Sequence, residues 1–523
     1  MADVIKAATA RRNVRTPSAA VVEMNRRRDL PRDLLGGTIQ MRGLGRKWLP
    51  KAELEEEEDY AARVLRSVLF NGFGDTVERK LPTKPFSKAL TIDERESVPK
   101  DLDPIFDNAD GSGSSLHEVA RAAFVDAATF GLSHFLVDLP KEKAATLHAQ
   151  RTSGIRPKIL NVYADAILGW KEKNTPAGKV LTQVRILETI TEDGEDEFST
   201  DCREVVLVLD EPAGAIYGPG GEVVSAESEG RWRRFREEAK SDGTREWALF
   251  DEGTYSAPRI PLLTFYTHKT GFMTAKPPLE SLAFTNLEHW LVSSDAANHL
   301  AWAMIAFYVA AGFRQDEVDQ LKADGLNWGS IARAVNEKAT LGMVEHSGEA
   351  ITAGERRLEK LEQQMEVLGL APFVERRSEA TATGVSSADS GTTSMLQEWV
   401  ADESQTITDA VKLAAKLTKQ TLHKDFRVRI YRDFVVPVGA ASEAPTILLA
   451  QAQGVIDKLQ AAKELQRRGT ISDEVDIEAM LERAKKEAVP AASTKGLDDP
   501  DDDDPDPDAP PKDKSKPPFP PKK

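Results

Sequence analysis

The chain has 523 residues, of which 40% are hydrophobic and 29% charged, as expected of a soluble globular protein with roughly two to four domains or one elongated subunit. Its formal net charge of −16 excludes a protein that holds DNA statically over its whole surface, because neutralising phosphates needs a basic protein. An acidic protein still suits a duplex that must slide, since like charge prevents sticking.

The N-terminal segment, residues 1–32, contains seven arginines and no long apolar stretch. It therefore does not resemble a secretory signal. We expect a flexible basic arm, which is either solvated or docked on nucleic acid or on an acidic neighbour.

Two helices are predicted before the middle of the chain. Pro50 and the acidic residues that follow it, up to Glu58, are typical of a helix N-terminus. This helix is expected to resume over Asp75–Lys80 after an interruption at Gly72–Gly74. The second helix opens with the capping box Ser115-Leu-His-Glu118.

Residues 135–266 are predicted to be rich in β-structure. Segments such as HFLVDLP, LTQVRILETI and CREVVLVLD are apolar and rich in β-branched residues, and their spacing favours hairpins. The last of these segments, Ile260–Tyr266, is followed by a break that contains glycine and proline.

From Pro277 onward the pattern turns helical. Two prolines suit a first helical turn, and a helix up to Met304 would be roughly 40 Å long. The most apolar window, Leu300–Gly312, is too short to span a bilayer, so we expect a buried or inter-subunit helix and no membrane association. Residues 313–351 are expected to form a small α/β insertion.

A returning helix is predicted after the insertion. Thr352-Ala-Gly-Glu355 is a capping box, and Gly369 suits the C-terminal cap. Residues 371–392 are polar and rich in Gly, Ser and Thr, which predicts a loop, and Ser394 then caps a long amphipathic helix. The apolar stripe of the returning helix consists of Leu358, Leu361, Met365 and Leu368.

The C-terminal part contains one more strand and a group of helices. FRVRIYRDFVV predicts the strand, and residues 445–489 predict two or three helices with Gly469 between them. The tail, residues 490–523, consists mainly of Asp, Pro and Lys. It has too little apolar surface to fold and is expected to be disordered.

Motifs for catalysis and metal binding are missing from the sequence. No GxxxxGK[ST] phosphate loop, GxSxG nucleophile elbow or HExxH zinc helix occurs, and the single cysteine excludes cysteine-based zinc sites and an intrachain disulfide. Asp295 and His299 are four residues apart, a spacing that is more often structural than metal-binding, and His289 beside Trp290 is expected to pack. We therefore expect no enzyme, no metal and no cofactor.

The order of four stretches resembles the portal proteins of tailed bacteriophages, in a branch often described only as a domain of unknown function with a portal-like profile. Together the stretches span most of residues 33–440, and their order is a more specific signal than any one of them. They are DLLGGTIQMRGLGRKWLP with EDYAARVLRSVLFNGFGDTVE, IPLLTFYTHKTGFMTAKPPLESLAFTNLEHWLVSSDAANHL, AITAGERRLEKLEQQMEVLG and TATGVSSADSGTTSMLQEW.

This resemblance implies an α+β fold in an elongated portal subunit. The implied parts, in chain order, are the basic arm (1–32), a β-rich wing (33–275), a stem helix (276–304), a small α/β clip (305–352), an antiparallel returning stem helix (353–370), a tunnel loop (371–393), a long helix with a wing strand (394–440), a helical crown (441–489) and the acidic, Pro-rich tail (490–523).

The resemblance also implies a location and partners. Portal proteins form rings of twelve subunits at one capsid vertex of the virion, assembled in the host cytoplasm, and the viral genome is packaged and ejected through them. The implied partners are further copies of the chain, double-stranded DNA without sequence preference, the large terminase subunit, the head-completion adaptor, and the major capsid and scaffolding proteins.

If the stem helices and the loop line a channel, five cations are the candidates for contact with phosphates, through contacts that depend on salt but not on sequence. The alternative is that the helix cations face solvent or pair between subunits. The five candidates are Arg356, Arg357, Lys360, Arg376 and Arg377.

Two other functions remain open from the sequence. One is another head–tail connector or minor capsid protein of a phage, although such chains are more often shorter and lack the helix–insertion–helix–loop–helix order of residues 277–424. The other is an unfamiliar enzyme built on residues 135–266, which would have a pocket and form a monomer or a small oligomer.

Overall fold

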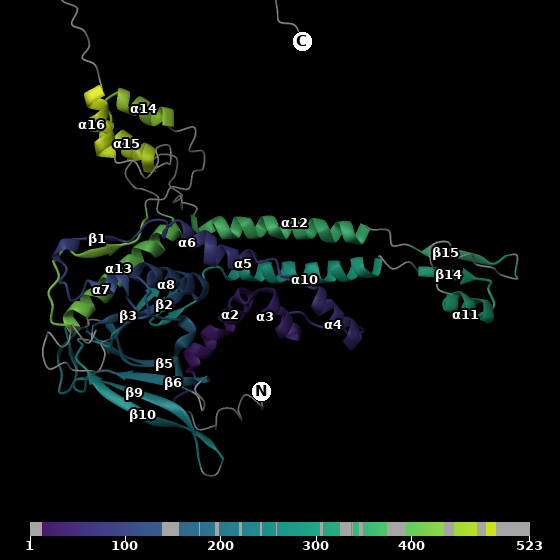
Figure 1. Cartoon of the computed structure of the whole chain (residues 1–523), viewed down its shortest axis with the longest axis horizontal. Helices are drawn as coiled ribbons and strands as arrows, with labels where there is room; N and C mark the ends of the chain where they lie inside the picture. Colours follow the sequence, from purple (N-terminus) through teal and green to yellow (C-terminus); the bar gives the residue numbers. More distant parts are fainter. Residues whose placement is uncertain are drawn as a thin grey trace, which may run out of the picture. The chain divides into compact units, whose positions relative to one another are not determined.

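Helices and strands are mixed throughout the computed structural model, which confirms the predicted α+β class (Figure 1). The chain divides into two compact units, Met1–Val436 and Pro437–Lys523. The predicted tail and most of the predicted tunnel loop lie outside the described residues. The described residues are 13–138, 156–176, 178–193, 198–218, 222–240, 243–257, 259–303, 307–324, 336, 338–344, 349–373, 394–432, 444–467 and 477–487.

Much of the N-terminal arm is a packed helix, α2 (Ala19–Leu35). Arg28 on this helix is 1% exposed, and its guanidinium donates hydrogen bonds to the carbonyls of Phe130 and Ala164, both at 3.3 Å. The prediction of a flexible, solvated arm is therefore wrong for residues 19–32. The arginine is buried because distant parts of the chain supply acceptors for it, and the local sequence does not show them.

A series of short helices follows α2. The predicted helix after Pro50 begins only at Glu57, and Glu55 lies before it and accepts a hydrogen bond from Ala52 N–H. Gly72–Gly74 is not an interruption, since it is itself helical and continues into a π-helical turn. These elements are α3 (Gly37–Leu44), η2 (Gly45–Lys47), α4 (Glu57–Arg66), α5 (Gly72–Gly74), η3 (Asp75–Lys80) and α6 (Leu81–Thr83).

The capping box at Ser115 is confirmed. Its hydroxyl accepts from the N–H of Glu118, and the carboxylate of Glu118 accepts from the N–H of Ser115 at 2.8 Å. The helix it opens, α8 (Leu116–Phe130), ends at Gly131, whose φ of 94° suits glycine. A single turn, α7 (Pro104–Asp107), precedes it.

A three-stranded antiparallel sheet lies at the centre of the first unit. Its order is β11-β2-β3, and α8 and α13 (Met395–Leu417) both pack against it. Strands predicted at HFLVDLP and at the end of the β-rich part are thus confirmed. The strands are β2 (Leu132–Asp138), β3 (Lys158–Val162) and β11 (Leu262–Tyr266).

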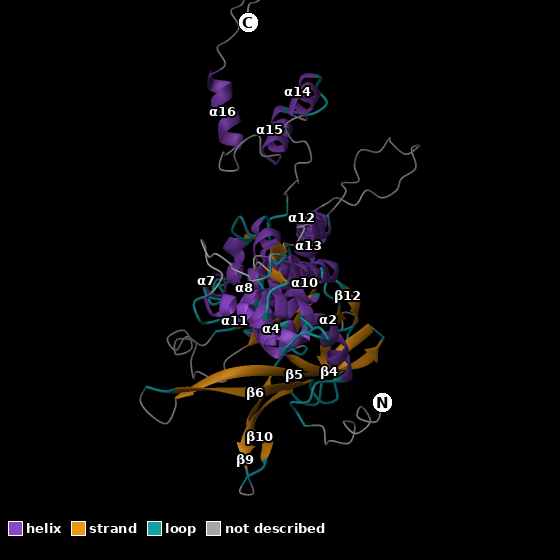
Figure 2. Cartoon of the chain, turned by 90° about the vertical axis from the view of Figure 1, so that its right-hand side faces the viewer, coloured by secondary structure: helices purple, strands orange, loops and turns teal. Residues whose placement is uncertain are grey.

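A second, five-stranded antiparallel sheet completes the predicted β-rich region. Its order is β10-β9-β6-β5-β4, and the β5–β6 and β9–β10 pairs extend from it in different directions (Figure 2). The strands are β4 (Ile167–Thr175), β5 (Gly178–Asp193), β6 (Thr200–Asp210), β9 (Gly230–Ala239) and β10 (Arg245–Tyr255).

Several short elements connect these layers. Of the predicted strand FRVRIYRDFVV, residues 426–432 are described, and they contain β16, which pairs with β1. The short elements are β1 (Thr91–Asp93), η4 (Arg95–Ser97), η5 (Ala164–Ala166), β7 (Ile216–Tyr217), β8 (Val223–Ser225), β12 (Lys269–Gly271), β13 (Thr274–Ala275), η6 (Ala371–Phe373) and β16 (Arg427–Arg429).

The predicted helix–insertion–helix order is present. However, the apolar window Leu300–Gly312 is not one helix, because α10 ends at Ala303 and Phe307–Ala311 is a strand paired with Thr340–Val344. Its aromatic and β-branched residues favour a strand once a partner strand is available. The elements are α10 (Glu280–Ala303), β14 (Phe307–Ala311), α11 (Gln315–Asp324), β15 (Thr340–Val344) and α12 (Glu349–Leu370).

Helix α12 begins earlier than predicted and continues through the residue predicted as its C-terminal cap. It begins at Glu349, so Thr352 lies inside the helix and does not cap it. Gly369 also lies inside the helix and is not its C-terminal cap. A Cβ added to Gly369 would lie 3.0 Å from the hydroxyl of Thr76, so this glycine permits close packing against η3. The predicted apolar stripe is confirmed, with Leu361 and Met365 buried.

The predicted capping box of α13 is confirmed by reciprocal hydrogen bonds between Ser394 and Gln397. The second unit contains three helices among its described residues, in agreement with the prediction for 445–489. They have a small core of their own around Ile447, Ala461 and Leu465. They are α14 (Ala444–Ala452), α15 (Lys458–Arg467) and α16 (Ile477–Glu487).

Candidate functional site

Helices α10 and α12 form an antiparallel pair that carries the β14–β15 insertion at its far end (Figure 1). The antiparallel direction follows from the contacts, because His289 meets Glu362 at 3.3 Å while Gly354 lies opposite Ala296, further along α10. At 1.5 Å per residue the 24 residues of α10 span about 36 Å. The predicted packing role of His289 is confirmed by its burial and by its contact with the ring of Phe70.

A buried asparagine fixes the first half of α10 to the N-terminal helices. Asn286 is 0% exposed. Its side-chain oxygen accepts from the N–H of Phe73 at 2.7 Å, and its side-chain nitrogen donates to the carbonyl of Phe70 at 2.8 Å. Both polar atoms of the side chain are thus used, and the root of the helix pair is held in one position.

A second contact to α10 lies further along the helix. It involves a largely buried ion pair between Arg63 of α4 and Glu55. The guanidinium of Arg63 donates two hydrogen bonds, of 2.7 and 2.8 Å, to the carboxylate of Glu55, and both side chains are at most 10% exposed. Asp295 of α10 lies 3.4 Å from the same guanidinium. Hydrogen bonding to Arg63 lowers the pKa of Glu55. Asp295 therefore has a structural partner, in line with the prediction.

Helix α12 carries the three helical candidates for DNA contact. Arg356 and Lys360 are exposed, whereas Arg357 is half-buried and paired with Glu288 of α10. The intramolecular pair of Arg357 was not among the alternatives that the sequence offered. The assignment of all three residues to DNA stays a prediction, and Arg376 and Arg377 lie outside the described residues.

Strand β9 is rich in arginine and aromatic residues, yet it is not a free basic surface. Each of its four arginines is paired with a carboxylate, which leaves little positive charge for nucleic acid. The pairs are Arg231 with Glu252, Arg233 with Asp210 (2.7 Å), Arg234 with Glu188 (3.6 Å) and Arg236 with Glu238 (2.8 Å).

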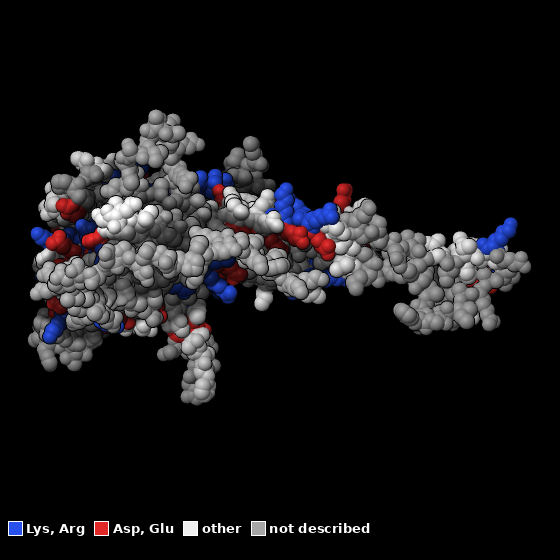
Figure 3. Space-filling model, turned by 90° about the horizontal axis from the view of Figure 1, so that it is seen from above, with Lys and Arg blue, Asp and Glu red and all other residues white. Residues whose placement is uncertain are grey.

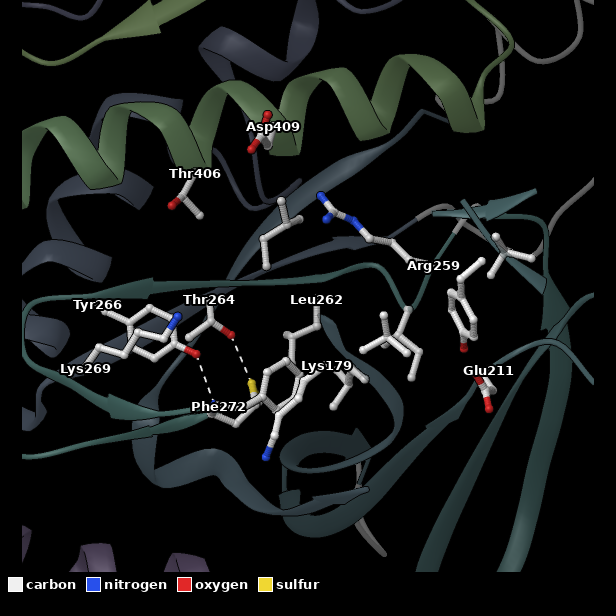
Figure 4. A pocket seen from close by; sticks show the side chains of 17 residues that line it. Lys179, Glu211, Arg259, Leu262, Thr264, Tyr266, Lys269, Phe272, Thr406 and Asp409 are labelled. Atoms are coloured by element: carbon white, nitrogen blue, oxygen red, sulfur yellow. Dashed lines mark hydrogen bonds between the residues drawn. The ribbon is translucent and has the colours of Figure 1, made fainter. Parts of the chain in front are cut away.

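A cavity of about 330 Å³ lies between the two sheets and α13, where a catalytic site in the β-rich region would be expected (Figure 4). Arg259 extends toward Asp409 of α13, and Tyr266 accepts a hydrogen bond from the N–H of Met273 at 3.1 Å. Burial raises the pKa of Glu211 in the same lining. The described lining contains no His, Cys or Ser, and its polar residues are threonines, tyrosines, lysines, an arginine and two carboxylates.

Metal-binding clusters and membrane-spanning helices are both absent from the described residues. Over the described ranges, no cluster of three or more His, Cys, Asp or Glu residues is arranged to hold a metal ion. In the same part of the chain, no helix combines the length and the apolar character needed to cross a membrane.

The family comparison covers the helix pair itself. Residues 278–418 match the model of a domain of unknown function, DUF4055. The match runs from the root of α10 to the end of α13, about a quarter of the chain. No curated protein sequence matches the chain.

Three solved structures are similar at low identity. A chain from the virion of a native gene transfer agent (GTA) particle is 9% identical with a TM-score of 0.36, covering 82% of this chain and 98% of that one. A chain from the neck of a native GTA particle, computed with C12 symmetry, is 10% identical with a TM-score of 0.36 and the same coverages. A chain from the neck of an empty particle, computed with C6 symmetry, is 8% identical with a TM-score of 0.34, covering 83% and 93%.

The residues that position the helix pair were missed in the sequence. Asn286 sits on an otherwise apolar helical face, which is a usable signal for a buried polar anchor. Nothing in the sequence indicates that Arg63 and Glu55 meet Asp295, because 232 residues separate Arg63 from Asp295.

Proposed function

We propose that the chain is a portal protein, whose copies form a ring around a channel that carries double-stranded DNA during genome packaging and ejection. The observation that carries the proposal is the α10–α12 pair, with a small insertion at its far end and with α13 as the next helix in the chain. Such a unit can tile a ring wall, because a helix pair anchored at its root leaves flanks exposed for neighbouring copies. The sequence resemblance to portal proteins covers the same elements.

The charge of the chain supports a conduit in preference to a clamp. A net charge of −16 repels phosphates and lets a duplex slide. The arginines of β9 are paired with carboxylates and therefore add no basic surface that would bind DNA. In this proposal Arg376 and Arg377 contact the DNA backbone without reading sequence. The insertion meets the large terminase subunit and later the head-completion adaptor at the capsid vertex, and the chain has no catalytic activity of its own.

The mass of the purified full-length protein tests the proposal. We expect a ring with a mass near twelve times that of the 57.4 kDa chain, seen by native mass spectrometry and as rings by electron microscopy. A minor capsid component or an enzyme would give a monomer or a small oligomer. A chain that stays monomeric at every protein and salt concentration would rule the portal function out.

A further inference from the structure

The exposed surface of α12 is divided into two flanks of opposite charge. Successive residues of an α-helix are turned by about 100°, so glutamates spaced by four, three and four residues lie in one row. A second row, turned by about 110° from the first, contains Arg356, Lys360 and the 70% exposed Val367. We call these the acidic flank and the basic flank. The acidic flank consists of Glu355, Glu359, Glu362 and Glu366.

Both flanks are largely without partners among the described residues of the chain. The buried edge of α12, with Leu361 and Met365, faces the core of the first unit. Among the described residues, Arg356 and Lys360 have no carboxylate partner, and the acidic flank has one polar contact, that of Glu362 with His289. Over the α10–α12 pair a band of basic side chains and a band of acidic side chains lie next to each other (Figure 3).

We propose that the acidic flank of one copy binds the basic flank of the next copy, side by side and with the helices parallel. This inference rests on the proposed ring. A rotation about a ring axis keeps every residue at its own height, and a heterologous contact joins two different faces of identical subunits. Glu355 and Arg356 differ in height by only about 1.5 Å, as do Glu359 and Lys360. Glu355 and Glu359 therefore lie nearly level with Arg356 and Lys360 of the neighbouring copy.

A second copy suits the basic flank better than DNA does. Val367 continues the row of Arg356 and Lys360, and an exposed valine gains free energy when protein covers it but contributes nothing to a phosphate. The acidic flank would repel a duplex and needs cations from elsewhere. One heterologous contact between two copies gives each flank the opposite charges that it lacks within its own chain. It assigns Arg356 and Lys360 to the ring interface and leaves the DNA role to the segment after α12.

Charge reversal tests the contact on the full-length protein. The double variant Arg356→Glu/Lys360→Glu makes both flanks negative. The variant Glu355→Lys/Glu359→Lys places two lysines in the acidic flank, at the positions level with Arg356 and Lys360. We expect each variant alone to lose the ring and run as smaller species in dilute salt, while circular dichroism shows a folded chain. An equal mixture of the two, and the quadruple variant that exchanges the flanks, should regain the mass of the wild-type ring. Lys416→Glu, an exposed reversal at the end of α13, is the control and should assemble normally.

The outcomes separate the inference from the function on which it rests. If the wild-type chain forms rings and both double variants form them equally well, the flank contact is wrong and the portal function stands. If Arg356→Glu/Lys360→Glu forms rings but no longer retains double-stranded DNA, the basic flank faces DNA and the inference is overturned in that way. A wild-type chain without rings overturns both.

Discussion

At the scale of single residues, the buried charged side chains of the first unit differ in whether they have hydrogen-bond partners. Arg28 and Arg63 find carbonyl or carboxylate acceptors, as buried ionic groups usually do. Glu403 on α13 is different, because it is 0% exposed and neither carboxyl oxygen has a hydrogen-bond partner within the described structure. Burial raises the pKa of Glu403 well above its ordinary value. This residue therefore lowers the stability of the fold at neutral pH.

Replacing Glu403 with Met should stabilise the protein, and more so at high pH. The raised pKa means that the folded state is most stable below the unfolded pKa, near 4.3, and loses stability as pH rises through the folded pKa. We expect Glu403→Met to gain about 1–3 kcal/mol at a pH of about 8 and less at a pH of about 5. Urea unfolding followed by circular dichroism at both pH values measures this.

The exposed Glu398 on the same helix supplies the control. Glu398→Gln should change the free energy of unfolding by less than about 0.5 kcal/mol at either pH. A Glu403→Met variant that is less stable than wild type at both pH values would show that the carboxyl group has a stabilising partner.

At the scale of elements, the α10–α12 pair depends on its root. Local propensity forms both helices, but the direction in which they leave the unit is set by contacts with the N-terminal helices. Asn286 joins α10 to the segment at Phe70 and Phe73, and the Arg63–Glu55 pair meets the same helix near Asp295. In the proposed ring the helix pair contacts neighbouring copies on its flanks, and these fixed points would hold its direction.

Asn286→Leu should release the root of α10. The side chain has a similar volume, but the buried N–H of Phe73 and the carbonyl of Phe70 each lose their partner. Leaving such groups unsatisfied costs about 2–4 kcal/mol in total. Denaturant unfolding of the purified variant measures the loss.

Asn298 is a matched control, since it lies on the same helix and accepts only an exposed hydrogen bond from Arg66. Asn298→Leu should cost less than about 0.5 kcal/mol. Equal losses in the two variants would mean that the buried hydrogen bonds of Asn286 do not anchor the helix.

At the scale of the whole molecule, the chain consists of two units with separate cores. The first contains both sheets and the helix pair, and the second has its own small core around Ile447, Ala461 and Leu465. Separate cores predict that the two units unfold separately.

A chain that ends at Val436 should therefore keep the fold of the first unit. We expect its main thermal transition, followed by circular dichroism, to have the same midpoint as in the full-length protein, with a loss of helical signal from α14–α16 only. A clearly lower midpoint would show that the second unit stabilises the first, contrary to the division into two units.

Local rules were sufficient where the interacting groups are neighbours in sequence. The capping boxes at Ser115 and Ser394 were predicted and are present, because each involves groups only three residues apart. The apolar stripe of α12 was likewise predicted from helical spacing. The same rule failed at Thr352, where the helix continues through a sequence that satisfies the capping pattern.

The sequence by itself determined the α+β class, the β-rich region and the order helix–insertion–helix–helix, because periodicity and caps depend on residues within about two turns of each other. Only the tertiary structure decided that Arg28 is buried, that Phe307–Ala311 is a strand, and that Arg357 pairs with Glu288. Each of these outcomes depends on a partner far away in the chain. Whether a residue is buried or paired in a sheet depends on the residues that it contacts. A local sequence pattern does not show which distant residues those are.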